Sequence, residues 1–124
     1  MTPAEFEPLL DKAVELLGKD VRESAKYHGP TEFESRVREV LTLVAKGEGV
    51  SINPTIHPHA FPDIRVNGFG VEVKTTNKDS WLSVGNSVFE GMRDPSVSQI
   101  YVVFGKMGGM GGRNLFNFLV ELLL

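Results

Sequence analysis

The sequence predicts an α/β domain in which helices flank a mixed β-sheet. Apolar residues recur at helical spacing in two early segments, and the dipeptide Asn67-Gly68 marks a β-hairpin. A third segment with helical spacing then leads to an apolar run at residues 99–104. A helix between the second hairpin strand and this later strand is a crossover, so the two strands are expected to run parallel.

The composition describes one ordinary domain covering residues 1–124. The chain has 124 residues, of which 41% are hydrophobic and 23% charged, and its net charge is −3. An acidic chain has no general attraction to nucleic acid, so any such contact needs a local patch. The chain has no cysteine, which excludes disulfides, thiol catalysis and zinc-thiolate sites. The N-terminus shows no secretory signal, so we expect a cytoplasmic protein.

The first helix is expected to start at Pro3, with Thr2 as cap and Glu5 completing a capping box. Gly18 is expected to end it, and residues 19–30 to form a connection. Its apolar stripe is Phe6, Leu9, Leu10, Ala13, Leu16 and Leu17.

The second helix is expected from Thr31 to Gly47. Its apolar stripe is Phe33, Val37, Val40, Leu41 and Val44. Residues 50–56 predict a short strand broken by Pro54. His57 and His59 follow in a loop, where they are minor candidates for a metal ligand or a general base.

After the hairpin we expect a third helix, capped by Asp79 or Ser80 and stopped by Asp94-Pro95. Its apolar stripe is Trp81, Val84, Val88, Phe89 and Met92.

The run QIYVVF at 99–104 suits a strand covered on both faces. GKMGGMGGR lacks the Walker spacing and is interpreted as a flexible loop. The last ten residues, LFNFLVELLL, are too short to cross a bilayer and predict a core helix or strand. Because the chain stops there without a cap, the alternative that it is a fragment of a longer protein stays open.

The hairpin carries the candidate functional residues. A two-residue turn at Asn67-Gly68 pairs Val66 with Phe69. Counting outward from that pair, Asp63 faces Glu72. The core face is Ile64, Val66, Phe69, Val71 and Val73, and the other face is Asp63, Arg65, Gly70, Glu72 and Lys74.

Like charges facing each other destabilise a sheet, so something should compensate for Asp63 and Glu72. Lys74 lies next to Glu72 on the same face. A divalent cation would compensate better, because two carboxylates, the main-chain carbonyl of Val73 and waters suit Mg²⁺. Lys74 is then placed to orient a water that attacks a phosphodiester. The alternative, an ordinary solvent-facing set of charges, stays open at this point.

Pro62-Asp63, eight residues and Glu72-Val73-Lys74 resemble the PD-(D/E)xK signature of the restriction-endonuclease-like nucleases. Residues 31–104 resemble that superfamily's core order, and the stretch looks most like type II restriction enzymes. The resemblance implies an endonuclease that cuts duplex DNA as a homodimer away from membranes. It also implies Mg²⁺, replaceable by Mn²⁺, held by Asp63, Glu72 and the Val73 carbonyl.

Many members of the superfamily add a glutamate from the preceding helix. The match is Glu34, although a capping box between Thr31 and Glu34 is the favoured interpretation, and Glu39 is a weaker alternative. Residues that could contact DNA, or equally serve as turn, cap and solvated groups, are Thr75, Thr76, Asn77, Lys78, Ser80, Arg93, Lys106 and Arg113.

Two departures from the superfamily keep other functions open. The chain is shorter than most such enzymes and lacks a strongly basic composition. Both would fit a core fragment of a longer enzyme or a small repair or junction-resolving nuclease. Further alternatives are a nuclease that acts on RNA or branched DNA, and a truncated or non-catalytic domain that keeps the fold and binds DNA or another partner. The recognition sequence and the cleavage position do not follow from the sequence.

Overall fold

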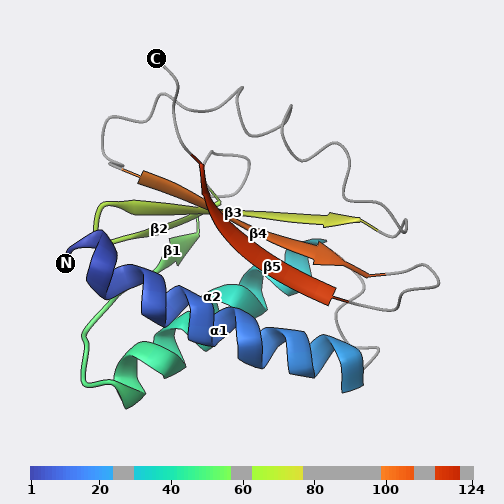
Figure 1. Cartoon of the computed structure of the whole chain (residues 1–124), viewed down its shortest axis with the longest axis horizontal. Coiled ribbons are helices and arrows are strands. Elements are labelled where there is room, and N and C mark those ends of the chain that lie inside the picture. Colours follow the sequence, from blue (N-terminus) through green and yellow to red (C-terminus); the bar gives the residue numbers. More distant parts are fainter. Residues whose placement is uncertain (24–29, 57–62, 77–98, 108–113, 121–124) are drawn as a thin grey trace.

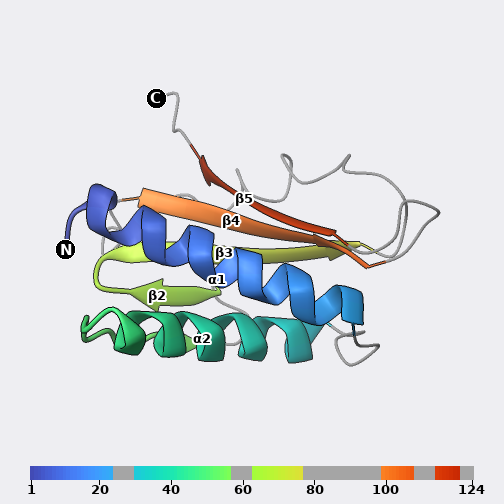
Figure 2. The same cartoon turned by 60° about the horizontal axis from the view of Figure 1, so that its bottom comes forward.

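The computed structural model describes residues 1–23, 30–56, 63–76, 99–107 and 114–120. They form a mixed α/β fold with two helices and a mixed sheet of five strands in the order β1-β2-β3-β4-β5 (Figure 1). Both helices lie on the same side of the sheet (Figure 2). The predicted α/β class is therefore confirmed for these residues.

Helix α1 (Pro3–Glu23) starts as predicted, because the amide of Thr2 donates a hydrogen bond of 3.1 Å to Oε1 of Glu5. The predicted end at Gly18 is wrong, as is the connection predicted from residue 19. Gly18 lies buried inside the helix, and the apolar stripe continues to Val21. Burial of Val21 offsets the cost of about 1 kcal/mol for a glycine inside a helix.

The buried stripe of α1 also differs from the prediction at Val14, Leu16 and Val21. Leu16 is 47% exposed, whereas Val14 and Val21 are buried. The remaining predicted positions of the stripe are buried as expected. A stripe of this width leaves one side of each turn in water, and Leu16 lies on that side.

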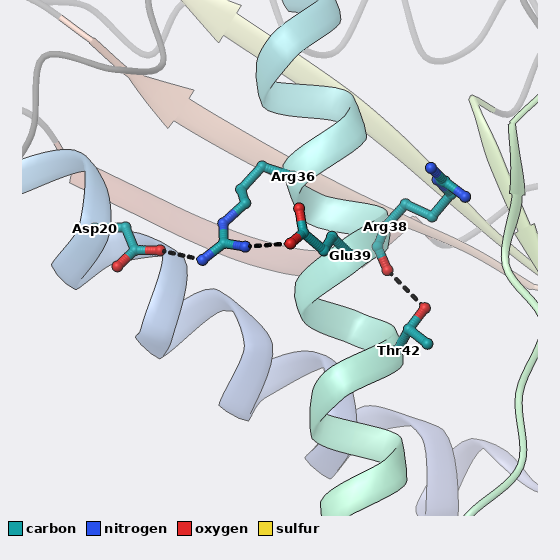
Figure 3. A network of polar contacts seen from close by, with 5 residues as sticks. All are labelled: Asp20, Arg36, Arg38, Glu39 and Thr42. Atoms are coloured by element: carbon teal, nitrogen blue, oxygen red, sulfur yellow. Dashed lines mark hydrogen bonds and ion pairs between the residues drawn. The ribbon is translucent and has the colours of Figure 1, made fainter.

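Helix α2 (Pro30–Gly47) buries all five residues of its predicted stripe. Arg36 joins the two helices, with its guanidinium 3.1 Å from Oδ2 of Asp20 in α1 and 2.9 Å from Oε1 of Glu39 (Figure 3). One turn further on, the hydroxyl of Thr42 donates to the carbonyl of Arg38 at 2.9 Å. These polar contacts lie in a partly exposed part of the helix layer.

The strands are β1 (Thr55–Ile56), β2 (Ile64–Val66), β3 (Phe69–Thr76), β4 (Gln99–Lys106) and β5 (Asn114–Val120). Strands β3 and β4 run parallel, as predicted, and the other neighbouring pairs are antiparallel. The strand predicted within 50–56 is reduced to two residues, and the last apolar run supplies β5. Residues 79–95, with the predicted third helix, and His57 and His59 lie outside the described residues.

Strand β4 is longer than predicted and is buried on both faces. Every residue from Ile100 to Lys106 is buried, which confirms a strand covered on both sides. The prediction that Gly105 and Lys106 begin a loop is wrong, because they pair with Thr75 and Thr76 of β3. Backbone pairing with an eight-residue neighbour holds them in the sheet.

The core lies between the sheet and the two helices. The ring of Phe6 in α1 stacks on that of Phe69 in β3, with centroids 4.7 Å apart, and lies 5.3 Å from the ring of Tyr101 in β4. The Tyr101 hydroxyl donates to Oε1 of Glu7 at 3.2 Å, so α1 is anchored by apolar and polar contacts together. Among the described residues, no helix is long and apolar enough to cross a membrane.

Candidate metal and phosphate site

The turn of the hairpin fixes the geometry of the candidate site. Asn67 and Gly68 have φ angles of 46° and 84°, as a type I′ turn requires at both central residues. Val66 therefore pairs with Phe69, and Ile64 with Val71, as predicted. The register contains no bulge, so alternation along β3 separates its core residues from its charged residues.

Alternation sends Phe69 and Val71 into the core with the helices. Glu72 and Lys74 therefore lie on the opposite face of β3. Glu72 is only 4% exposed, while about a third of the Lys74 side chain is exposed. This burial departs from an ordinary solvent-facing strand, in which a glutamate would remain in water.

Two hydrogen bonds hold Asp63 against β3, one to Glu72 and one to Val73. The amide of Asp63 donates to Oε1 of Glu72 at 3.2 Å, and the amide of Val73 donates to Oδ2 of Asp63 at 2.8 Å. The predicted proximity of the two carboxyl groups is therefore confirmed. Strand β2 begins one residue later, at Ile64, so Asp63 directly precedes the paired strand.

A proton compensates for the two neighbouring carboxyl groups in the metal-free protein. Burial above all, and then a hydrogen bond with the Asp63 carboxyl and the charge of Asp63, raise the pKa of Glu72 to about 8. Lys74 acts in the other direction, with its Nζ 3.4 Å from Oε2 of Glu72. At neutral pH the Glu72 carboxyl is therefore mostly protonated.

Glu34 lies in the first turns of α2, half-buried and within electrostatic range of Asp63. Burial, and then the charge of Asp63, raise its pKa. The predicted capping box, which needs Thr31 as the N-cap, is wrong. Pro30 is already helical, so Thr31 lies inside the helix. Glu39 instead pairs with Arg36, and 59% of its side chain is exposed. Glu34 therefore interacts electrostatically with Asp63, whereas Glu39 is engaged by Arg36.

The donor chemistry fits a hard divalent cation. No group of three or more His, Cys, Asp or Glu side chains in the described parts of the chain is arranged to hold a metal. Mg²⁺ does not need such a cage, because it is usually bound through one or two carboxylates and retains several waters. Asp63 and Glu72 can supply the two carboxylates.

The predicted DNA-contacting residues do not share one surface. Thr76 and Lys106 pair with each other and lie on the face of Glu72, whereas Thr75 points to the opposite face. Lys106 is 7% exposed, so the sequence missed its position in the sheet. Extending β4 to match the length of β3 would have found it. The remaining predicted contacts, Asn77, Lys78, Ser80, Arg93 and Arg113, lie outside the described residues.

Comparison of the chain with models of known protein families, with curated proteins and with solved structures gave no match. The features of this chain that bear on function are therefore the geometry of the hairpin and the sequence motif that it carries.

Proposed function

We propose that this protein is a Mg²⁺-dependent endonuclease that hydrolyses phosphodiester bonds in duplex DNA. The observation that carries the proposal is the arrangement on one hairpin. Asp63 and Glu72 are in contact, and Nζ of Lys74 lies 3.4 Å from the Glu72 carboxyl. This grouping agrees with the PD-(D/E)xK pattern and supports a similarity to type II restriction enzymes, which act as homodimers and accept Mn²⁺ in place of Mg²⁺.

Each residue has a role that its position allows. Asp63 and Glu72 would hold Mg²⁺ with the Val73 carbonyl, and Glu34 would add negative charge beside Asp63. The ion supplies Lewis acidity at the phosphoryl oxygen and lowers the pKa of a bound water. The Val73 amide orients the Asp63 carboxylate through its hydrogen bond.

Lys74 is the group that acts on the reacting atoms. When Glu72 is ionised in the loaded site, the ammonium of Lys74 remains beside it and can orient the attacking water. The same positive charge stabilises the negative charge that develops on the phosphoryl oxygens. Substitution of Lys74 by Met is therefore expected to lower kcat strongly, with a smaller effect on binding of DNA.

The decisive test is cleavage of supercoiled plasmid DNA by purified protein in Mg²⁺ and in EDTA. Asp63→Ala should abolish cleavage, because it removes one of the two carboxylates. The matched control is Glu39→Ala, which removes an exposed carboxylate of α2 outside the site and should leave cleavage unchanged. Discrete fragments would indicate sequence-specific cutting, and a smear would indicate non-specific cutting.

Metal binding can be measured without activity. Mg²⁺ that binds the folded state should raise the Tm of the wild-type protein and not that of Asp63→Ala. Circular dichroism of both proteins shows whether the variant remains folded. Cleavage retained by a folded Asp63→Ala protein would refute the assigned role, and equal Tm shifts in both proteins would refute the metal site.

A second candidate is a domain that binds DNA without cutting it. The observation that favours it is the hydrogen bond that the buried Glu72 carboxyl accepts from the amide of Asp63, because this bond helps to satisfy the carboxyl without a metal. Such a domain should bind duplex DNA equally in Mg²⁺ and in EDTA. It should leave the plasmid intact under both conditions.

A further inference from the structure

Helix α2 carries a row of polar side chains that begins beside the candidate site. Glu34 is followed at intervals of four residues by Arg38, Thr42 and Lys46, which places the four along one ridge of the helix. Glu34, at the start of the row, is within electrostatic range of Asp63. The three residues that follow it are all exposed and include two cations, one hydroxyl and no carboxylate. Arg38, Thr42 and Lys46 are called the α2 ridge below.

The side chain of Arg38 is directed away from helix α1 (Figure 3). Arg36 extends the other way, where its guanidinium lies 3.1 Å from the Asp20 carboxylate and 2.9 Å from that of Glu39. Within the described residues, no ion pair engages the side chain of Arg38 or of Lys46. Charges on the side of α2 that faces α1 therefore neutralise one another, whereas the α2 ridge presents positive charge to solvent.

The far end of the α2 ridge borders a groove. Its volume is about 410 Å³, and its lining consists of Thr42 and Lys46 from the helix and of residues 49–52 from the segment that follows. This segment is held against the end of the helix, because the amide of Val50 donates to the carbonyl of Ala45 at 2.8 Å. The volume lies within the range of about 300–1,000 Å³ that is typical of ligand clefts. The ridge therefore connects the candidate site with a hollow that an ammonium and hydroxyl groups border.

We propose that the α2 ridge binds the DNA backbone beside the position of cleavage, with Arg38 and Lys46 each contacting a phosphate and the groove receiving the backbone at the far end. Lysine, arginine, serine and threonine side chains are the groups that contact phosphate and sugar in protein–DNA complexes. Arg38 and Lys46 are eight residues apart, which is about 12 Å along the helix. This length corresponds to about three or four nucleotides of one strand at a rise of about 3.4 Å. The inference rests on the proposed function for its substrate class.

The α2 ridge has a different role from Lys74. A contact to a phosphate that does not react contributes equally to the bound substrate and to the transition state. Its loss therefore raises KM and leaves kcat nearly unchanged. Contacts to the backbone also carry no sequence information, so two duplexes of unrelated sequence should lose the same affinity.

The experiment measures binding of a fluorescein-labelled duplex by anisotropy, in EDTA so that nothing is cut, from about 50 to about 200 mM salt. The double variant Arg38→Gln, Lys46→Gln should weaken binding by at least about tenfold at 0.1 M salt. It should also reduce the slope of log K against log salt concentration by about 1.8, since each lost phosphate contact reduces it by about 0.9.

Two further variants serve as controls. The double variant Lys19→Gln, Arg22→Gln removes the same two charges from exposed positions of α1, and its affinity and salt slope should match those of the wild type. The double variant Arg38→Lys, Lys46→Arg retains both charges of the α2 ridge and should retain the salt slope. Thermal unfolding by circular dichroism should give similar Tm values for all of these proteins, because the substituted side chains are exposed.

The outcomes separate this inference from the proposed function. An unchanged salt slope in the α2 double variant, an equal loss in the α1 double variant, or a wild type that does not bind the duplex would overturn the role of the ridge. Poly-glutamate that displaces the duplex as well as unlabelled DNA does would assign the ridge to an acidic protein partner and overturn the DNA contact. A reduced slope in a protein that leaves plasmid intact in Mg²⁺ would support the ridge and refute the nuclease. Plasmid cleavage by the wild type, together with an unchanged slope, would support the nuclease alone.

Discussion

The two sides of the sheet use the same strands in opposite ways. Towards the helices, β3 presents Phe69 and Val71, which pack with residues of both helices in one apolar core. Away from the helices, the same strand presents Glu72 and Lys74. The difference shows that alternation along one strand is enough to separate the source of stability from the candidate chemistry. Each side can therefore be altered with little effect on the other.

The largest expected effect on stability comes from the helix side. Phe6→Ala removes a fully buried ring that stacks on Phe69 and contacts Tyr101. Loss of a buried phenylalanine costs about 3–5 kcal/mol of the free energy of unfolding. For a chain of this length the Tm should fall by about 10 °C or more. Thermal unfolding followed by circular dichroism measures this change.

Leu16→Ala is the matched control for Phe6→Ala, because Leu16 lies on the same helix and is 47% exposed. Its free energy of unfolding should change by about 0.5 kcal/mol or less. Equal destabilisation by the two substitutions would show that α1 does not seal the core as described.

The next effect comes from the other side of the sheet and depends on pH. Glu72→Gln should stabilise the metal-free protein at pH 9 and have little effect at pH 5. The reason is that the folded state of the wild type binds the Glu72 proton more tightly than the unfolded state, with a pKa raised from 4.5 to about 8. The free energy of unfolding of the wild type therefore falls as pH rises through that window.

The size of this pH effect is on the order of a few kcal/mol, since one pKa unit corresponds to about 1.4 kcal/mol. Urea unfolding in EDTA at pH 5, 7 and 9 measures it for both proteins. Glu39→Gln is the control, because its carboxyl is exposed and paired with Arg36. A wild-type stability that rises from pH 5 to pH 9 relative to Glu72→Gln would contradict the raised pKa.

The sequence predicted the parts of this fold that depend on local rules. The turn at Asn67-Gly68 fixed the register of the hairpin, and apolar spacing predicted both helices and the parallel strand. The end of α1 was predicted too early, because the local helix-stop signal of Gly18 is outweighed by the burial of Val21 further along the helix. Propensity reports one residue, whereas tertiary burial depends on the whole helix.

The candidate site shows the same limit. Contact between Asp63 and Glu72 follows from the turn and was therefore predictable. The burial of Glu72 and the position of Lys106 were not, because both depend on how β3 and β4 pair and are covered. The sequence favoured a helix-cap role for Glu34. Its electrostatic interaction with Asp63 was not predictable, because it exists only when α2 packs beside the hairpin.

The smallest expected effect concerns charges of the helix layer. Arg36 contacts Asp20 across the helices at 3.1 Å, with side chains 26% and 37% exposed (Figure 3). A double-mutant cycle with Asp20→Asn and Arg36→Gln should give a coupling energy of about 0.5 kcal/mol, because water screens partly exposed pairs. The cycle is measured by urea unfolding at 0.1 M salt, and the coupling should shrink at 1 M salt.

A coupling above about 2 kcal/mol would mean that Arg36 belongs to a network that holds the helices together. The contrast between exposed charges on one side of the sheet and buried charges on the other would then need revision. With the weak coupling expected, the helix-layer charges contribute little to stability, whereas the burial of Glu72 makes its protonation a larger determinant of the free energy of unfolding.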